Sequence, residues 1–299
     1  MDFKRIIKMT KTGELFFRIK EELSVFRIKN KIIKNMQLEY RESIRIKKKY
    51  GYILENMEKN ETKSYPSNKV WIFWYQGIDK APKLIQKCIE SIKNTFKDKE
   101  VIILTKDNYK QYVEFPEYIN KKFANGTISY THFSDLLRIE LLAKYGGTWC
   151  DATVFCTGKI PEYITDAKLF VFKNIELDRN DKELIAASNW FISAYSNNDI
   201  IVATRNLLFE YWKQEKFLTN YFIFHLFFKM VIEKFEKQWK EVPTFNNVSP
   251  HILQFELLDE YDEKRFEQIK LMSPIHKLNK VIENKDKNAT TFYEHILNS

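Results

Sequence analysis

The chain has 299 residues, of which 44% are hydrophobic and 15% aromatic. That is long and apolar enough for one sizeable core, and it excludes an intrinsically disordered protein. The formal net charge is +9, and residues 1–60 hold 16 Lys and Arg against 8 Asp and Glu, so +8 of it lies in the first fifth of the chain. No stretch reaches the roughly 18 apolar residues of a membrane span, and we expect no signal peptide.

The first 58 residues are predicted to form two helices with a break near Tyr50 and Gly51. Apolar residues recur there at helical spacing among basic ones: Leu15, Ile19, Leu23, Phe26 and Ile33, with Lys20, Arg27, Lys31 and Lys34. A basic amphipathic helix suits an anionic membrane surface. It equally suits a helix that packs on the rest of the chain or on a second copy in a homo-oligomer, and these alternatives stay open. Nucleic acid is disfavoured as a partner, because acids interrupt the basic residues and no known motif accompanies them.

A polar segment at 59–68 is typical of a linker. We therefore predict a basic helical appendage over 1–62 and a second domain over 63–299. Apolar periodicity then predicts strands at 70–75, 101–105, 148–155, 169–174 and 184–193, and helices at 82–95, 131–144, 199–216 and 219–240. This alternation predicts an α/β fold with a Rossmann-like, mostly parallel sheet flanked by helices.

The three cysteines, Cys88, Cys150 and Cys156, show neither a CxxC pair nor a metal-ligand spacing. We expect free thiols in a reducing compartment, which favours a cytoplasmic location.

The most informative segment is the predicted helix at 131–144 with the strand that follows it. Asp135 and Arg138 lie three residues apart, so they share one helical face. Gly146 and Gly147 fit the end of a helix, and Asp151 lies in the following strand, near the edge where open α/β sheets bind ligands. Together these side chains offer an acceptor for sugar hydroxyls, a donor for phosphate and an oxygen ligand for a divalent cation. Taken alone, an acid after two glycines is equally typical of a turn with a capping aspartate.

Residues 134–153 resemble the S-D-x-x-R…Y-G-G-x-W-x-D motif of GT-A type glycosyltransferases with a DXD-like motif. That group includes mannosyltransferases, the clostridial glucosylating toxins and capsular polysaccharide synthesis enzymes. The capsule branch is the most similar, because it shares W-x-x-W-x-Q-G, here at 71–77, and G-G-x-W-x-D-A-T, here at 146–153. The resemblance covers 69–163 and, more faintly, 188–280, but not the first sixty residues.

This resemblance implies a GT-A fold and a hexosyltransferase of bacterial capsule synthesis. The donor would be a nucleotide-diphosphate sugar, a UDP-sugar by resemblance, held with a divalent cation, Mn²⁺ or Mg²⁺. The acceptor would be a growing surface glycan or a lipid-linked saccharide at the inner face of the plasma membrane, and transfer would retain the anomeric configuration. The alternative is a noncatalytic nucleotide-sugar-binding or membrane-surface scaffold protein with a degenerate DXD site.

The catalytic residues implied by the resemblance are Asp135, Arg138, Asp151 and Asn189. Asn189 is either a contact of the donor or a structural amide, since an amide among apolar residues must find partners. The expected donor-binding residues are Trp71, Trp74, Gln76, Gly77, Asp135, Arg138, His276 and Lys277. Trp71 and Trp74 lie three apart in a strand, so they point to opposite faces. By resemblance one of them stacks on the uracil, and we favour Trp74, which Gln76 and Gly77 follow.

The expected metal ligands are Asp151, Thr153 and His251. Thr153 stands where the second acid of the DXD motif would be, which leaves one carboxylate for the cation. His251 and His276 each follow a proline turn, and Lys277 could neutralise a diphosphate leaving group.

Two further histidines differ in their surroundings. His132 precedes Asp135 and is expected to line the cleft, whereas His225 lies on an apolar helix face and is expected in the core.

Overall fold

A computed structural model describes residues 3–57, 63–175, 183–279 and 290–298. Its centre is a five-stranded sheet in the order β2-β1-β3-β6-β5. The strands are β1 (Lys69–Phe73), β2 (Glu100–Leu104), β3 (Gly147–Asp151), β5 (Leu169–Lys173) and β6 (Ala187–Ala194). β1 pairs in parallel with both β2 and β3, whereas β6 runs antiparallel to β3 and to β5. The predicted fold class, a mostly parallel sheet flanked by helices, is confirmed.

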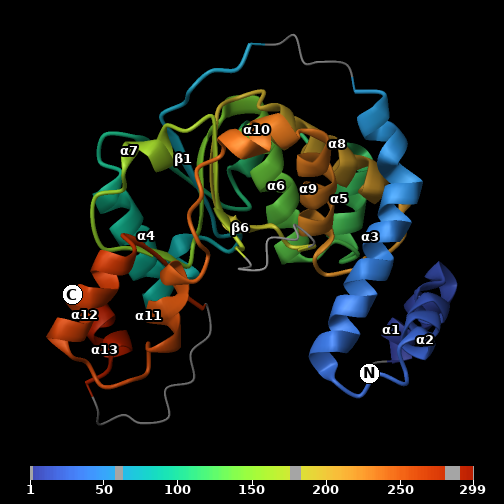
Figure 1. Ribbon diagram of the computed structural model, residues 1–299, viewed down its shortest axis with the longest axis horizontal. Helices are drawn as coiled ribbons and strands as arrows, with labels where there is room; N and C mark the ends of the chain where they lie inside the picture. Colours follow the sequence, from blue (N-terminus) through green and yellow to red (C-terminus); the bar gives the residue numbers. More distant parts are fainter. Residues whose placement is uncertain (1–2, 58–62, 176–182, 280–289, 299) are drawn as a thin grey trace.

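Helices cover both faces of the sheet (Figure 1). Alternation along β1 explains why both faces are apolar: Trp71 and Phe73 belong to one core cluster, and Val70 and Ile72 to the other. The first cluster includes side chains of α6 (Tyr130–Tyr145), α8 (Asp199–Gln214) and α9 (Ile223–Lys234). The second includes one face of α4 (Lys83–Thr95). The molecule is therefore a three-layer α/β structure around one sheet.

A third, smaller core joins α4 to the C-terminal helices. These are α11 (Ile252–Phe255), α12 (Glu263–Met272) and α13 (Phe292–Asn298), which gather beside α4 in Figure 1. Leu84 and Cys88 of α4 pack there with Leu253, Ile269 and Phe292. The remaining short elements are η1 (Ile78–Lys80), η2 (Tyr109–Gln111), α5 (Glu117–Ala124), α7 (Glu162–Thr165), α10 (Glu236–Glu241) and η3 (Ser249–His251).

The strand predicted at 148–155 is in fact two strands. β3 ends at Asp151, residues 152 and 153 form a turn, and β4 (Val154–Cys156) leaves the main sheet. β4 pairs antiparallel with β7 (Ile275–Lys277), and Val154 is the partner of Lys277. This two-stranded ribbon brings a segment near the C-terminus to the end of β3.

The N-terminal part contains three helices and not the predicted two: α1 (Phe3–Thr12), α2 (Glu14–Ser24) and α3 (Lys31–Glu55). The predicted break at Gly51 is wrong, because α3 runs through it. The chain breaks instead at Gly13, whose φ of 81° suits glycine, and before α3, where Asn30 caps the helix by accepting from the backbone N–H groups of Ile32 and Ile33. The long helix predicted at 219–240 also breaks, at Phe235, between α9 and α10.

The second half of α3 is part of the main core. Ile46, Tyr50 and Leu54 are buried there, and the Tyr50 hydroxyl donates to Glu215 at 2.9 Å. Arg45 also pairs with Glu215, at 2.8 Å. The first half of α3 and the outer face of α2 lie at the surface. The domain boundary at residue 62 stays a prediction, but the last turns of α3 pack as an integral part of the α/β body.

Candidate active site at the carboxyl edge of the sheet

Asp151 is placed by strand geometry. It is the last residue of β3 and is paired in register with Phe73, the last residue of β1, so it lies at the edge where both parallel strands end. Side chains two apart in a strand share a face. Asp151 therefore lies on the same face as Trp149, whose indole N–H donates to Asp151 Oδ1 at 2.9 Å. Because Trp149 belongs to the core cluster that contains α6, this face directs Asp151 toward that helix.

Arg138 of α6 bridges the two predicted acids. Its Nη1 donates to Asp135 Oδ1 at 2.5 Å, and its Nη2 donates to Asp151 Oδ1 at 3.0 Å. The guanidinium also lies 4.9 Å from the centre of the Trp149 ring. Only 4% of the Arg138 side chain and 9% of the Asp135 side chain are exposed. Both groups therefore interact mainly with their protein neighbours. Little of the Arg138 side chain is accessible for the direct contact with phosphate that we expected from the sequence.

Asp135 is surrounded by further polar groups. Asn189 Nδ2 donates to Asp135 Oδ1 at 2.9 Å, and His132 Nδ1 lies 3.4 Å from Oδ2. Burial alone would raise the pKa of Asp135, but Arg138 and the histidines His132 and His225 together lower it below its ordinary value. Burial in turn lowers the pKa of His225 to about 4, against an opposing effect of Asp135. Asp135 is therefore an ionised anchor for Asn189 and Arg138.

Lys277 completes the cluster from the ribbon. Its Nζ donates to Asp151 Oδ2 at 3.0 Å and also to the hydroxyl of Thr153. Burial would raise the pKa of Asp151, but Lys277 and Arg138 outweigh it and hold that pKa below its ordinary value. The side chains of Asp151 and Lys277 are 25% and 20% exposed. These two are thus the charged members of the cluster that solvent or a ligand can reach.

The structure corrects the donor-binding predictions for Trp71 and His276. Trp71 is fully buried, and its indole N–H donates to the carbonyl of Gly146 at 2.9 Å. His276 is also fully buried, with Nε2 3.0 Å from the Thr157 hydroxyl. Trp71 is buried because β1 is covered by core on both faces. In β7, strand alternation places His276 on the face opposite to that of its neighbour Lys277.

Trp74 lies where the sequence favoured it, just after the end of β1. It packs on the core cluster opposite to that of Trp71, as their spacing predicted. Its side chain is partly exposed, while its buried indole N–H has no hydrogen-bond partner in the structure. Gly77 follows with φ at 90°, a conformation that favours glycine. Gln76 beside it is exposed.

The predicted metal ligands Asp151 and Thr153 lie on either side of the Lys277 ammonium, which binds both of them. Among the residues that the structure describes, no three His, Cys, Asp or Glu side chains are grouped so as to hold a metal ion. His251 Nδ1 lies 2.7 Å from the carbonyl oxygen of Asn247, and the Thr153 hydroxyl accepts from Lys277. Both oxygens of Asp151 already accept hydrogen bonds from cationic side chains. This donor set does not fit a divalent cation.

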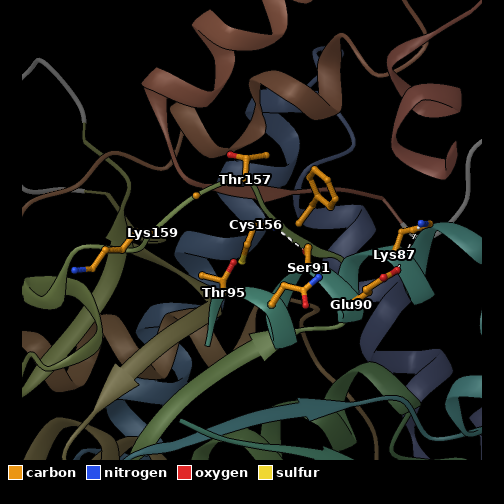
Figure 2. A pocket seen from close by; sticks show the side chains of 10 residues that line it. Lys87, Glu90, Ser91, Thr95, Cys156, Thr157 and Lys159 are labelled. Carbon is orange, nitrogen blue, oxygen red and sulfur yellow. Dashed lines mark hydrogen bonds and ion pairs between the residues drawn. The ribbon is translucent and has the colours of Figure 1, made fainter. Parts of the chain in front are cut away.

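A separate hollow of about 520 Å³ lies on the other side of the ribbon, between α4 and β4 (Figure 2). Its lining includes Ser91, whose hydroxyl accepts from the backbone N–H of Cys156 at 2.9 Å. It contains no member of the cluster around Asp151. We therefore place the candidate site at the sheet edge.

Two contributors were not predicted from the sequence. Trp149 orients Asp151, and its position two residues earlier in a strand was a signal that could have revealed it. His225 acts on Asp135, but its apolar neighbours along the helix made it indistinguishable from a core residue.

Comparisons with known proteins bear on the family of the chain as a whole. Residues 22–296 match a family described as "Capsular polysaccharide synthesis protein". The match begins at residue 22, which corrects the expectation that the first sixty residues lie outside the resemblance. A stretch of 95 residues is 34% identical to the O-glycosyltransferase braB of Annulohypoxylon truncatum, covering 29% of this chain and 23% of that protein. The chain thus spans only about a quarter of this curated relative. A solved structure, "PaToxG Glycosyltransferase", aligns with 80% of this chain and 94% of its own at a TM-score of 0.40 and 16% identity.

Proposed function

The chain belongs to the capsular polysaccharide synthesis protein family, and from that premise we propose that it is a glycosyltransferase. The reaction would move a hexose from a nucleotide-diphosphate sugar, a UDP-sugar in the first instance, to a glycan or lipid-linked saccharide. The observation that carries this proposal is the cluster of Asp135, Arg138, Asp151 and Lys277 at the carboxyl edge of a mostly parallel sheet. Open α/β sheets bind their ligands at this edge.

Charge development decides which residues act on the donor. When the bond between the anomeric carbon and the diphosphate breaks, negative charge grows on the departing phosphate oxygens. A fixed cation beside those oxygens stabilises the transition state. Lys277 suits this role because its ammonium is partly exposed, whereas Arg138 is almost wholly buried. Asp151 then positions Lys277, and Arg138 holds Asp151 to α6.

The sugar would lie next to Asn189. Asn189 lies near the beginning of β6, at the end of that strand that meets the same sheet edge. Its side-chain amide donates a hydrogen bond to Asp135 at 2.9 Å. The amide is partly exposed, so its remaining donor and acceptor capacity suits sugar hydroxyls. For the nucleotide base we propose Trp74 as the stacking surface, with Gln76 and Gly77 beside it.

We propose that the transfer retains the anomeric configuration, because both carboxylates of the cluster are already bound to cationic side chains. A carboxylate with a lowered pKa is a weak base, and both Asp135 and Asp151 are in that condition. Neither is suited to take a proton from an acceptor hydroxyl. In a retaining transfer the departing diphosphate oxygen takes that proton, while the new bond from the acceptor oxygen to the anomeric carbon replaces the broken one.

For the acceptor we propose a second hollow, which contains no residue of the cluster itself but includes the segment that leads into β6. This hollow of about 750 Å³ lies between α3 and α9 and reaches Leu184 and Ile185, which lead into β6 and Asn189. Its lining mixes apolar and polar groups such as Tyr40 and Gln37, which suits a saccharide. The outer face of α2 and the turn after it also carry exposed apolar side chains, with Phe16 at 75%, Leu23 at 63% and Phe26 at 68% exposure. We propose that this face rests on an anionic membrane at the inner side of the plasma membrane, where a lipid-linked acceptor would be found.

No helix in the described part of the chain is long and apolar enough to cross a bilayer. Any membrane contact of these helices would therefore be peripheral.

The experiment is a hydrolysis assay with a panel of nucleotide-sugars, each incubated with the full chain and with Asp151→Asn. We expect one donor to be hydrolysed by the wild type and far more slowly by the variant. Absence of hydrolysis together with absence of nucleotide binding would contradict the proposed function. Binding without hydrolysis of any donor would instead identify a noncatalytic nucleotide-sugar-binding protein.

A further inference from the structure

We infer that the ammonium group of Lys277 takes the place of a divalent cation, so that the donor diphosphate is bound without a metal ion. This inference rests on the proposed function and adds to it how the leaving group is neutralised. It begins from the disagreement between the expected DXD metal site and the donor set that the described residues provide.

The hydrogen bonds of Asp151 leave little room for a metal. Its Oδ1 accepts from Arg138 and from Trp149, and its Oδ2 accepts from Lys277. A carboxylate has about four acceptor sites, so three are used. Divalent cations such as Mg²⁺ and Ca²⁺ require about six or more oxygen ligands. Waters and diphosphate oxygens can fill most of these positions, but at least one carboxylate must face the ion. The other carboxylate of the cluster, Asp135, is already engaged, because its Oδ1 accepts from Arg138 and Asn189 and its Oδ2 lies 3.4 Å from His132.

The charges of the cluster already balance. Two carboxylates, Asp135 and Asp151, face two cations, Arg138 and Lys277. A divalent cation at Asp151 would lie next to both of these positive groups and would be repelled by them. The disagreement is thus a matter of charge as well as of ligand number.

Thr153 and Lys277 form a matched pair. The position of the second motif acid holds a neutral hydroxyl, and this hydroxyl accepts a hydrogen bond from the Lys277 ammonium. One carboxylate and one hydroxyl suit a monovalent ammonium, whereas a divalent ion is better served by two carboxylates. An ammonium has three N–H donors, of which Asp151 and Thr153 take two. The third is left for an oxygen of the diphosphate.

The backbone fixes Lys277 in this position. It pairs with Val154 in the ribbon, and the next residue, Leu278, donates its N–H to the carbonyl of Thr153 at 2.9 Å. The backbone at Lys277 is therefore held against the residues of the turn that follows β3. A cation that is held before the donor arrives costs no reorganisation during the reaction.

The test measures UDP and GDP affinity of the full chain by calorimetry, with EDTA and then with MnCl₂, and donor hydrolysis under the same two conditions. We expect affinity and hydrolysis to be the same in EDTA and in Mn²⁺. The EPR signal of free Mn²⁺ should not decrease when wild-type protein is added. In EDTA, Lys277→Ala should bind the nucleotide about tenfold to a hundredfold more weakly, the effect of losing one charged hydrogen bond.

The control is Lys159→Ala, which removes the same charge from an exposed lysine that lies on β4's far side and outside the cluster. Its nucleotide affinity should equal that of the wild type. Hydrolysis that EDTA abolishes and Mn²⁺ restores in the wild type would overturn the inference while leaving the transferase in place. An unchanged affinity in folded Lys277→Ala would also overturn it. Absence of nucleotide binding and of hydrolysis with and without metal would remove the proposed function, and the inference with it.

Discussion

The cluster at the sheet edge and the N-terminal helices are both rich in charge, but they hold it in opposite ways. At the sheet edge each cation has a carboxylate partner, and no side chain of the two pairs centred on Asp151 exceeds 25% exposure. On α3 an ion pair such as Lys47 with Glu233 has side chains that are 69% and 46% exposed. The charges at the sheet edge are thus fixed and sheltered by their protein neighbours, whereas those on α3 are solvated at the surface.

This difference shows why net charge does not reveal the candidate site. The charge surplus of the sequence lies almost entirely in its first fifth, where it covers the surface of α1 to α3. The sheet-edge cluster adds nothing to net charge, because its two carboxylates and two cations cancel. Buried charges must be paired to be tolerated, so a charged site in a protein interior is nearly invisible to a charge count.

The largest effect is expected from Arg138→Ala, which leaves two buried carboxylates facing each other. Breaking a buried ion pair costs about 3–5 kcal/mol of unfolding free energy. Arg138→Lys should cost less, because it keeps the charge but cannot bridge both acids with a planar group. Urea unfolding measures both. The matched control is Arg41→Ala on α3, whose side chain is 43% exposed and whose pair with Glu21 should be worth at most about 1 kcal/mol. Equal losses in the two alanine variants would remove the distinction between the regions.

The next largest effect is expected from Asp151→Asn, which should lower the rate of donor turnover. The amide keeps the size of the side chain but loses the charge that holds Lys277 and Arg138. Loss of one preorganised electrostatic group costs on the order of 10²- to 10³-fold in rate. The measurement is steady-state hydrolysis of the donor. Asp166→Asn is the control, because its pair with Lys99 lies at the surface with 56% of the Asp166 side chain exposed. Near-normal turnover of Asp151→Asn would contradict the assignment of the site.

A smaller effect is expected from the pH dependence of stability. Burial lowers the pKa of His276 to about 4 from its ordinary 6.5. Between these two values the unfolded chain binds a proton that the folded chain does not, so the stability present above pH 6.5 is lost as the pH falls toward 4. His276→Gln removes this contribution. The wild type should therefore lose about 1–2 kcal/mol more than the variant when the pH is lowered from 7 to 5, by urea unfolding. Parallel losses in the two proteins would show that His276 is not held neutral.

Much of the sheet and of the site could be predicted from local pattern. β-branched and aromatic runs gave the main strands, and helical spacing together with strand position brought Asp135, Arg138 and Asp151 to one edge. Lys277 was selected for its chemistry near a proline turn, and it does reach Asp151 from 126 residues away in the chain.

The rest depended on contacts that no local pattern encodes. The turn at residues 152 and 153 separates β3 from β4 because β4 finds its partner in β7, far along the chain. α3 continues through Gly51 because Tyr50 and Leu54 are buried against α8 and α9, and this packing outweighs the low helix propensity of glycine. Asp151 and Thr153 were expected as metal ligands from a motif, and the motif could not indicate that a lysine would bind one oxygen of its remaining acid.

The smallest effect on stability and turnover is expected on the outer face of α2. Phe16 and Leu23 of this helix and Phe26 in the turn after it are exposed, so replacing all three by Ser should change the free energy of unfolding by only about 0.5 kcal/mol per site. Donor hydrolysis should not change. Binding to vesicles that contain phosphatidylserine should weaken strongly, because each large apolar side chain that enters a lipid surface contributes about 1.5–3 kcal/mol.

Cosedimentation with vesicles tests this, with Leu271→Ser as the control. Leu271 lies on α12 and is 88% exposed. Its substitution therefore removes a similar apolar side chain from a face outside the proposed membrane surface. If the triple variant binds vesicles as well as the wild type, the membrane proposal is wrong. Analytical ultracentrifugation then distinguishes the remaining alternatives. Self-association of the wild type that the triple variant lacks would assign the face of α2 to a second copy of the chain. With either partner, a membrane or a second copy of the chain, the N-terminal helices would have no role in binding the donor. Donor binding would remain with the sheet-edge cluster.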